Sequence, residues 1–191
     1  LMYEKDSSRW KRLGPKIQMI SSATVDPSDS NTLFLACGNG IVRSQDGGET
    51  WRMTTGWRES DVLQIAIDPG NSKLVYAATA WGVITSTDGG DTWDLQDSGT
   101  TNSFTDVQFF DTQTGWIISS QNIFHTIDGG NTWISQNLGS IPLNGLYFVD
   151  NQTGWAVGGN TPIGTILKYN LGKFCRIINL ISFAFCPLYI Q

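Results

Sequence analysis

The stretch Ser86-Thr-Asp88-Gly89-Gly90-Asp-Thr92-Trp93 decides the fold, because the chain contains this pattern three times. A short carboxylate followed by two glycines favours a tight β-hairpin: the Asp can accept hydrogen bonds from N–H groups of the turn, and glycine adopts positive φ at little steric cost. The tryptophan then begins the return strand and can fold its ring under the turn. We call these segments the Asp-Gly-Gly turns and predict a structural role for their residues: Ser44, Asp46, Gly48, Thr50 and Trp51; Ser86, Asp88, Gly90, Thr92 and Trp93; Thr126, Asp128, Gly130, Thr132 and Trp133.

The spacing of the turns indicates a repeated unit. Asp46, Asp88 and Asp128 are 42 and 40 residues apart, and Trp10 stands 41 residues before Trp51. Four short antiparallel strands within about 40 residues are typical of one blade of a β-propeller. In the second unit we expect these strands at 64–67, 74–79, 83–86 and 92–95. The sequence therefore predicts an all-β chain, an incomplete propeller of about four four-stranded antiparallel blades over residues 15–168, without helices in the 60–80 or 105–125 windows.

The last unit departs from the pattern. Leu171-Gly172-Lys173 stands where Asp-Gly-Gly is expected, and the chain then runs through an apolar stretch, 174–191. We expect residues 1–173 to form the blades, with degenerate first and last units. The stretch 174–191 is either a divergent terminal strand or a non-native continuation after a reading-frame slip. We favour the slip, and expect this tail not to complete a regular blade and to be poorly ordered or loosely packed.

Composition narrows the classes of function. Hydrophobic residues make up 40% of the 191 residues and charged residues 15%, which is typical of a chain that folds. The net charge is −5, and no basic cluster exceeds Arg9, Lys11 and Arg12, so we expect no nucleic-acid partner. The apolar tail is short and interrupted by polar residues, so we expect no membrane span. The cysteines lack metal-ligand spacing, and we expect neither a metal nor a cofactor.

A glycoside hydrolase would need two carboxylates at a set separation. Apart from the aspartates of turns, the chain offers Glu59, Asp61 and Asp106, which we place in the connections between blades. These connections are short, whereas lids and deep pockets need longer loops. We therefore assign no catalytic residue and lean towards a protein that is not an enzyme.

The connections between blades lie on the face opposite the Asp-Gly-Gly turns, because successive strands alternate in direction. Trp57 and Trp81 fall in these loops and outside the repeated pattern. With Arg58 and Glu59 they form the binding site that we predict, for a protein or a carbohydrate. Trp116 and Trp155 stand at matching positions on second strands, so we expect both to pack between blades.

These phrases resemble known repeats. The Asp-Gly-Gly turns resemble the Asp-box (bacterial neuraminidase, or BNR) repeat, and the phrases 153–158 and 164–168 resemble the propellers of the photosystem II stability/assembly factor-like family. The phrase from Asp68 to Thr79 resembles, less closely, sortilin-type and xyloglucanase-type Asp-box propellers. The resemblance implies that the turns lie away from the active-site face, as in the Asp-box enzymes. It also implies a location outside the cytoplasm, secreted, periplasmic or on the cell surface.

Two functions follow from the resemblance. The first is a non-catalytic binding scaffold for protein–protein interaction, similar to an assembly factor. The alternative is a fragment of a sialidase- or xyloglucanase-type glycoside hydrolase. Sialidase chemistry, as the resemblance implies it, needs an arginine triad, and the chain has six arginines and no Arg-Ile-Pro phrase. The partner-binding arginine patch of the assembly-factor family has no visible counterpart, so photosystem binding is not carried over.

Overall fold

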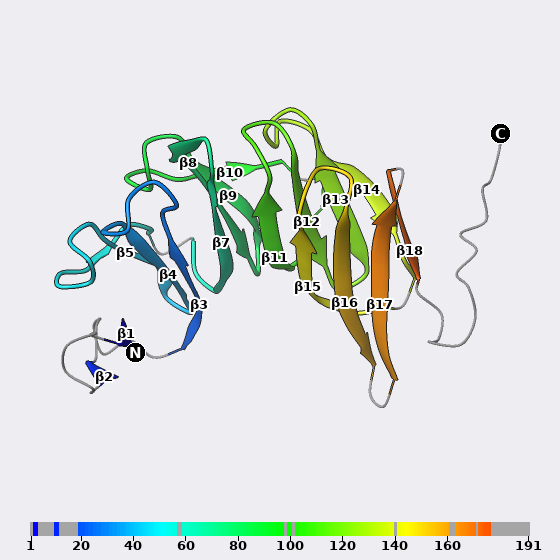
Figure 1. Ribbon diagram of the computed structural model, residues 1–191, viewed down its shortest axis with the longest axis horizontal. Helices are drawn as coiled ribbons and strands as arrows, with labels where there is room; N and C mark the ends of the chain where they lie inside the picture. The colour runs from blue at the N-terminus through cyan, green and yellow to red at the C-terminus, as the bar shows by residue number, and fades with distance from the viewer. Residues whose placement is uncertain are drawn as a thin grey trace.

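The computed structural model describes residues 2–3, 10–11, 19–56, 59–97, 99–100, 102–139, 141–160, 163–170 and 172–176. Within these ranges every regular element is a β-strand, and sixteen strands form four four-stranded antiparallel sheets. The sheets follow one another along the chain and stand side by side (Figure 1). This confirms the prediction of an all-β fold built from about four blades. The described residues include no helix that is long and apolar enough to cross a membrane.

Each sheet consists of four consecutive strands, and we number the sheets as blades 1 to 4. Strands β1 (Met2–Tyr3) and β2 (Trp10–Lys11) pair with each other outside these blades. The blades comprise β3 (Ile20–Val25), β4 (Leu33–Cys37), β5 (Gly40–Ser44) and β6 (Arg52–Met53); β7 (Val62–Asp68), β8 (Asn71–Thr79), β9 (Gly82–Ser86) and β10 (Asp94–Gln96); β11 (Phe104–Phe109), β12 (Gly115–Ser119), β13 (Asn122–Thr126) and β14 (Ile134–Asn137); β15 (Leu143–Phe148), β16 (Gly154–Asn160), β17 (Ile163–Asn170) and β18 (Lys173–Arg176).

The core lies between the blades and depends on aromatic stacking. Trp116 of β12 is fully buried, and its ring stacks on Phe148 of the next blade with centroids 3.6 Å apart. Tyr76 of β8 stacks in the same way on Phe109, at 3.4 Å. The prediction that Trp116 packs between blades is therefore confirmed. Its counterpart Trp155 is half-buried, since blade 4 is the last blade in the described part of the chain.

A glycine at the start of two second strands makes room for this packing. A Cβ atom on Gly115 would lie 2.6 Å from the ring of Phe109, and one on Gly154 would lie 2.5 Å from the ring of Phe148. Each ring therefore covers the glycine that pairs with it across the sheet. This contact explains the Thr-Gly-Trp phrase that opens the second strand in blades 3 and 4.

Blade 4 corrects one expectation about the tail. Lys173–Arg176 forms strand β18 and completes the four-stranded sheet, so the expectation that the tail 174–191 does not complete a regular blade is wrong. The hairpin is shorter than in the other blades, because Asn170 pairs directly with Lys173. Gly172 has a φ of 84°, so a single glycine in the left-handed region makes the turn that the two glycines of an Asp-Gly-Gly turn make elsewhere. Residues 177–191 lie outside the described residues.

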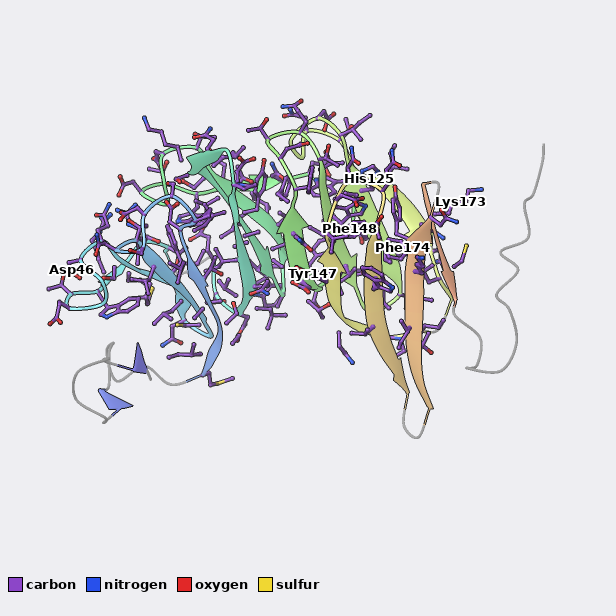
Figure 2. All side chains as sticks on the ribbon, in the orientation of Figure 1. Asp46, His125, Tyr147, Phe148, Lys173 and Phe174 are labelled. Carbon is purple, nitrogen blue, oxygen red and sulfur yellow. The ribbon has the colours of Figure 1, made fainter. Side chains whose placement is uncertain are left out.

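Phe174 takes the place of the missing tryptophan. In blade 3, Trp133 meets Phe109 edge-on, with ring centroids 6.1 Å apart and an interplanar angle of 84°. In blade 4, Phe174 meets Phe148 at 5.8 Å and 85°. Figure 2 labels Phe148 and Phe174 at this position. A different aromatic residue, reached through a shorter turn, thus holds the outer strand of the last blade.

Candidate binding face

The blades present two rims. On one, which we call the turn rim, each Asp-Gly-Gly turn contacts the end of its own blade where the first strand leads into the second. The N–H groups of Gly47, Gly89 and Gly129 donate to the carbonyls of Asn31, Lys73 and Gln113 at 2.8–3.0 Å; Asn31 and Gln113 lie in loops, and Lys73 lies near the start of β8. On the other, the loop rim, lie the turns between second and third strands and the connections between blades. The two rims differ in chemistry: the polar groups of the Asp-Gly-Gly turns are bonded to one another on the turn rim, whereas the loop rim carries the exposed Trp81.

The Asp-Gly-Gly turns use their polar groups internally. Asp88 accepts hydrogen bonds from the Thr92 N–H at 2.9 Å, the Thr92 hydroxyl at 2.6 Å and the Ser86 hydroxyl at 2.7 Å. The Ser86 hydroxyl is buried and accepts the Gly90 N–H at 2.7 Å. The turns around Asp46 and Asp128 repeat this arrangement. Both glycines of each turn have φ between 70° and 94°, where other residues are strained.

These hydrogen bonds also keep the carboxylates ionised. The Thr50 hydroxyl lowers the pKa of Asp46 to about 2, with help from the Thr50 N–H. The equivalent threonines lower the pKa values of Asp88 and Asp128. A carboxylate held as an acceptor in this way serves the turn and is poorly suited to donate a proton at neutral pH.

The Asp-Gly-Gly turns of blades 2 and 3 also join their blades to the preceding blade. Arg43 of blade 1 donates to the carbonyl of Gly89, and Tyr76 of blade 2 donates from its hydroxyl to the carbonyl of Gly129 at 3.2 Å. The Trp93 indole donates to the Thr54 hydroxyl of blade 1 at 3.2 Å. The turn rim is therefore occupied by contacts that hold the blades together.

The loop rim has a different construction. Asp61 has a φ of 52°. Its backbone N–H donates to the Gly38 carbonyl at 2.9 Å, and its backbone carbonyl accepts a hydrogen bond from the Ala80 N–H at 3.0 Å. Its backbone thus links the β4–β5 turn of blade 1 to the β8–β9 turn of blade 2, while its side chain is exposed. Trp81 follows Ala80 directly, so the connection around Glu59 and the Trp81 turn lie on the same rim.

A cavity opens beside this connection. It has a volume of about 390 Å³ and lies between the β4–β5 turn and the β6–β7 connection, lined by Asn39, Met53, Thr55, Gly56 and Ser60. Glu59 accepts the Gly56 N–H at 2.8 Å and so fixes the loop at the cavity wall. Met53 is itself 43% exposed, which gives the cavity an apolar side.

Trp81 is an exposed aromatic side chain on this rim. Its side chain is 65% exposed. Its backbone N–H donates to the Thr79 hydroxyl at 3.0 Å, and this hydrogen bond stabilises the tight β8–β9 turn. Trp57 and Arg58, the other two members of the predicted binding site, lie outside the described residues, so their part in the site stays a prediction. The structure places Glu59 and Trp81 on one rim, as their positions in connecting loops predicted.

The three carboxylates considered for catalysis do not share a pocket wall. Glu59 caps Gly56 and Asp61 is exposed, whereas Asp106 belongs to strand β11 rather than to a connection. Asp106 accepts the Leu146 N–H of blade 4 at 2.8 Å, and burial raises its pKa. The placement of Asp106 in a connecting loop is therefore wrong: it joins two blades. Among the described residues, no group of three or more His, Cys, Asp and Glu side chains is arranged to hold a metal ion.

Sequence reasoning missed two features of the rims. Met53 and Thr55 line the loop-rim cavity, but they stand in an irregular connection without a repeated pattern. A second cavity of about 380 Å³ lies at the turn rim of blade 4, lined by Asn151, Gln152, Thr153, Tyr169, Asn170 and Gly172. The sequence signal for this second cavity was the replacement of Asp-Gly-Gly by Leu171-Gly172-Lys173 in the fourth unit. A shorter hairpin leaves space where the longer Asp-Gly-Gly turn would lie.

Comparison with known proteins supports the fold. The chain matches no protein-family model and no curated protein sequence. Among solved structures it is similar to a GH74 enzyme from Niastella koreensis, with 25% identity over 84% of this chain and 30% of the enzyme, and a TM-score of 0.73. It is also similar to YCF48 from Cyanidioschyzon merolae, with 21% identity over 79% of this chain and 50% of that protein, and a TM-score of 0.62.

A structure of YCF48 bound to a D1 peptide is a further match, with 18% identity over 86% of this chain and 56% of that protein, and a TM-score of 0.67. The chain spans between about a third and a little over half of the length of these proteins. Their likeness, together with four consecutive four-stranded sheets, shows that the chain has the β-propeller fold and corresponds to part of a propeller.

Proposed function

We propose that this chain is a non-catalytic propeller scaffold that binds a protein partner at its loop rim. The observation that carries the proposal is the exposed Trp81 on the same rim as the cavity beside Glu59. An exposed indole provides a large rigid contact area, and aromatic residues are frequent anchors of protein interfaces. The turn rim is less suitable, because its polar groups are already bonded within and between blades.

The comparisons support a protein partner in a general way. One similar structure, YCF48, is bound to a D1 peptide, so a propeller of this shape can bind a peptide. The further proposal that the Asp-Gly-Gly turns are Asp boxes rests on their sequence pattern. A location outside the cytoplasm rests on the family resemblance alone.

A carbohydrate-binding or glycoside-hydrolase role is the second candidate. The likeness to a GH74 enzyme at 25% identity favours it, and an exposed tryptophan such as Trp81 also fits the face of a sugar ring. The two candidates share the loop rim but differ in ligand, so one set of variants can separate them.

The test compares binding of the full chain to an immobilised peptide library and to an array of xyloglucan and sialylated oligosaccharides. Trp81→Ala removes the indole, and Ile127→Ala is the matched control, because Ile127 is 63% exposed within a turn on the opposite rim. We expect peptide binding that Trp81→Ala abolishes and Ile127→Ala leaves intact. Binding to oligosaccharides alone, with the same dependence on Trp81, would favour the second candidate. Peptide binding unaffected by Trp81→Ala would contradict the loop-rim site.

A further inference from the structure

Two side chains of blade 3 hold buried nitrogen atoms without hydrogen bonds. The indole Nε1 of Trp116 and the imidazole Nε2 of His125 have no hydrogen-bond partner among the described residues. The two residues pair across β12 and β13, and their rings stack with centroids 4.8 Å apart. A buried polar group without a partner costs free energy, so two such nitrogens in stacked rings indicate an acceptor that comes from elsewhere.

The preceding blades show where these nitrogens are directed. Tyr76 occupies the position of Trp116 in blade 2, as the strand registers show. Arg43 occupies the position of His125 in blade 1, since each precedes the Ser or Thr that bonds the turn of its own blade. Tyr76 and Arg43 both donate to the carbonyl of the first glycine in the next blade's Asp-Gly-Gly turn. By the same register, Trp116 and His125 are directed at the turn of blade 4.

Blade 4 has no Asp-Gly-Gly turn at that place. Its hairpin is shorter, and the cavity of about 380 Å³ lies beside it, a volume in the range of ligand pockets. Tyr169 lines this cavity and meets both rings edge-on, with its centroid 5.9 Å from that of Trp116 and 6.4 Å from that of His125. Figure 2 labels His125 and Lys173 of the short hairpin towards the same end of blades 3 and 4. The cavity and the two unpaired nitrogens therefore adjoin the same ring.

A single glycine bridges the equivalent positions in blade 3. Gly129, the first glycine of its turn, donates its N–H to the Gln113 carbonyl of its own blade at 2.9 Å and accepts the Tyr76 hydroxyl of blade 2 at 3.2 Å. Gln152 stands at the position of Gln113 in blade 4, two residues before the glycine that opens the second strand, and it lines the cavity. Among the described residues, the short hairpin donates no hydrogen bond to the Gln152 carbonyl.

We propose that the cavity at the short hairpin of blade 4 binds a glycine-containing turn of a partner protein, which takes the place of an Asp-Gly-Gly turn. One glycine of such a turn supplies both missing groups: its N–H for the Gln152 carbonyl, and its carbonyl for Trp116 Nε1 and His125 Nε2. Burial lowers the pKa of His125, so its imidazole is neutral at pH 7, and an acceptor at this place favours the Nε2–H tautomer. Glycine suits the site because the turn glycines of blades 1 to 3 have positive φ.

The test titrates the full chain with the peptide acetyl-Ser-Thr-Asp-Gly-Gly-Asp-Thr-amide, which copies residues 86–92 and contains no tryptophan. Nuclear magnetic resonance of the nitrogen-15-labelled chain reads both nitrogens, because His125 is the single histidine and Trp116→Phe assigns the indole signal. We expect the indole N–H and imidazole signals to shift together, with the imidazole in the Nε2–H tautomer. A matched peptide with sarcosine in place of the first glycine lacks the N–H for Gln152, and calorimetry should show about tenfold weaker binding.

Variants of the chain locate the peptide. His125→Phe keeps an aromatic ring on Trp116 but removes the nitrogen, and should also weaken binding about tenfold. Thr85→Val is the matched control, because Thr85 holds this position in blade 2, where the next blade has a complete turn. Trp81→Ala, on the loop rim, should leave binding of this peptide unchanged, so the result does not depend on the proposed function.

Three results would overturn the proposal. Indole and imidazole signals that stay in place at saturating peptide would mean that the two nitrogens do not meet the ligand. Equal affinity for the glycine and sarcosine peptides would mean that the Gln152 carbonyl takes no part. Equal affinity of His125→Phe and the native chain would place the peptide at another site. The comparison of the two peptides uses the native chain, so it remains decisive if a variant fails to fold.

Discussion

Gln108 holds the backbone of Phe148 in the next blade with both ends of its side-chain amide. Its Nε2 donates to the Phe148 carbonyl at 2.9 Å, and its Oε1 accepts the Phe148 N–H at 2.7 Å. The same two-point contact recurs at the outer strands, where Gln136 binds the backbone of Phe174 with both distances at 3.0 Å. Blades 3 and 4 are therefore joined by directional hydrogen bonds at their inner and outer strands, in addition to apolar packing.

Gln108→Ala should destabilise the chain by about 1–3 kcal/mol, because it leaves the partly buried N–H and carbonyl of Phe148 without their partner. Urea unfolding followed by tryptophan fluorescence would measure the change. Gln113→Ala is the control, since Gln113 is exposed and its side-chain amide donates to the carbonyl of the neighbouring Thr112 in the same loop. Equal unfolding midpoints for the two variants would contradict the role of Gln108.

Ser86→Ala should lower stability by a similar amount, about 1–3 kcal/mol, because the buried Gly90 N–H loses its acceptor. Peptide binding at the loop rim should not change, since the turn lies on the opposite rim. The measurement is a thermal melt combined with the peptide-binding assay. Intact stability with lost binding would assign the turn to ligand recognition instead of to the fold.

Local chemistry explains why so much of the fold could be predicted. The predicted strands 74–79 and 83–86 correspond to β8 (Asn71–Thr79) and β9 (Gly82–Ser86), because strand patterning and turn residues are readable within a short window. Trp116 could be placed between blades because its position repeats. Such features depend on neighbours in sequence or on the repeat itself.

Features that depend on distant residues could not be predicted. Gln108 and Phe148 are 40 residues apart, and no phrase marks one as the partner of the other. Phe174 substitutes for the tryptophan only because the hairpin before it is shorter, which shifts the alignment of the fourth unit. At the loop rim, the sequence predicted Trp81 and Glu59 from their place in connecting loops outside the repeated pattern. The cavity depends on Met53 and Thr55, whose positions follow from an irregular loop path.

Gly115→Ala should destabilise blade 3 by about 1–3 kcal/mol, because the new methyl group would lie 2.6 Å from the Phe109 ring and force it out of its stack on Tyr76. Gly164→Ala is the matched control in a strand of blade 4, since the nearest atom to its added methyl group would be 3.9 Å away. Chemical denaturation of both variants would measure the difference. A loss in Gly164→Ala as large as that in Gly115→Ala would show that strand glycines matter here through backbone entropy instead of through ring packing.

The chain should not hydrolyse a fluorogenic sialoside or a xyloglucan substrate. The Asp106 carboxylate accepts the Leu146 N–H between blades 3 and 4, and the Glu59 carboxylate accepts the Gly56 N–H within a loop. The described part of the loop rim therefore shows no pair of carboxylates at a shared pocket, which a glycoside hydrolase needs. Fluorescence release and reducing-sugar assays would measure turnover. Hydrolysis that Glu59→Gln abolishes would establish an enzyme and overturn the scaffold proposal.

Acid should destabilise the chain through the Asp-Gly-Gly turns. The pKa of Asp46 is lowered to about 2 in the folded chain, and those of Asp88 and Asp128 are also lowered, by the hydroxyl and N–H donors of the turns. An unfolded chain, whose aspartates titrate near 3.9, therefore binds more protons than the folded chain in this range. The stabilisation is complete above about pH 5 and declines as the pH falls towards the folded pKa values. The free energy of unfolding, measured from pH 7 to pH 2, should fall less steeply in Asp46→Asn/Asp88→Asn/Asp128→Asn than in the native chain. Identical slopes would mean that other carboxylates, such as Asp26 and Asp111, whose pKa values are also lowered, control the acid response.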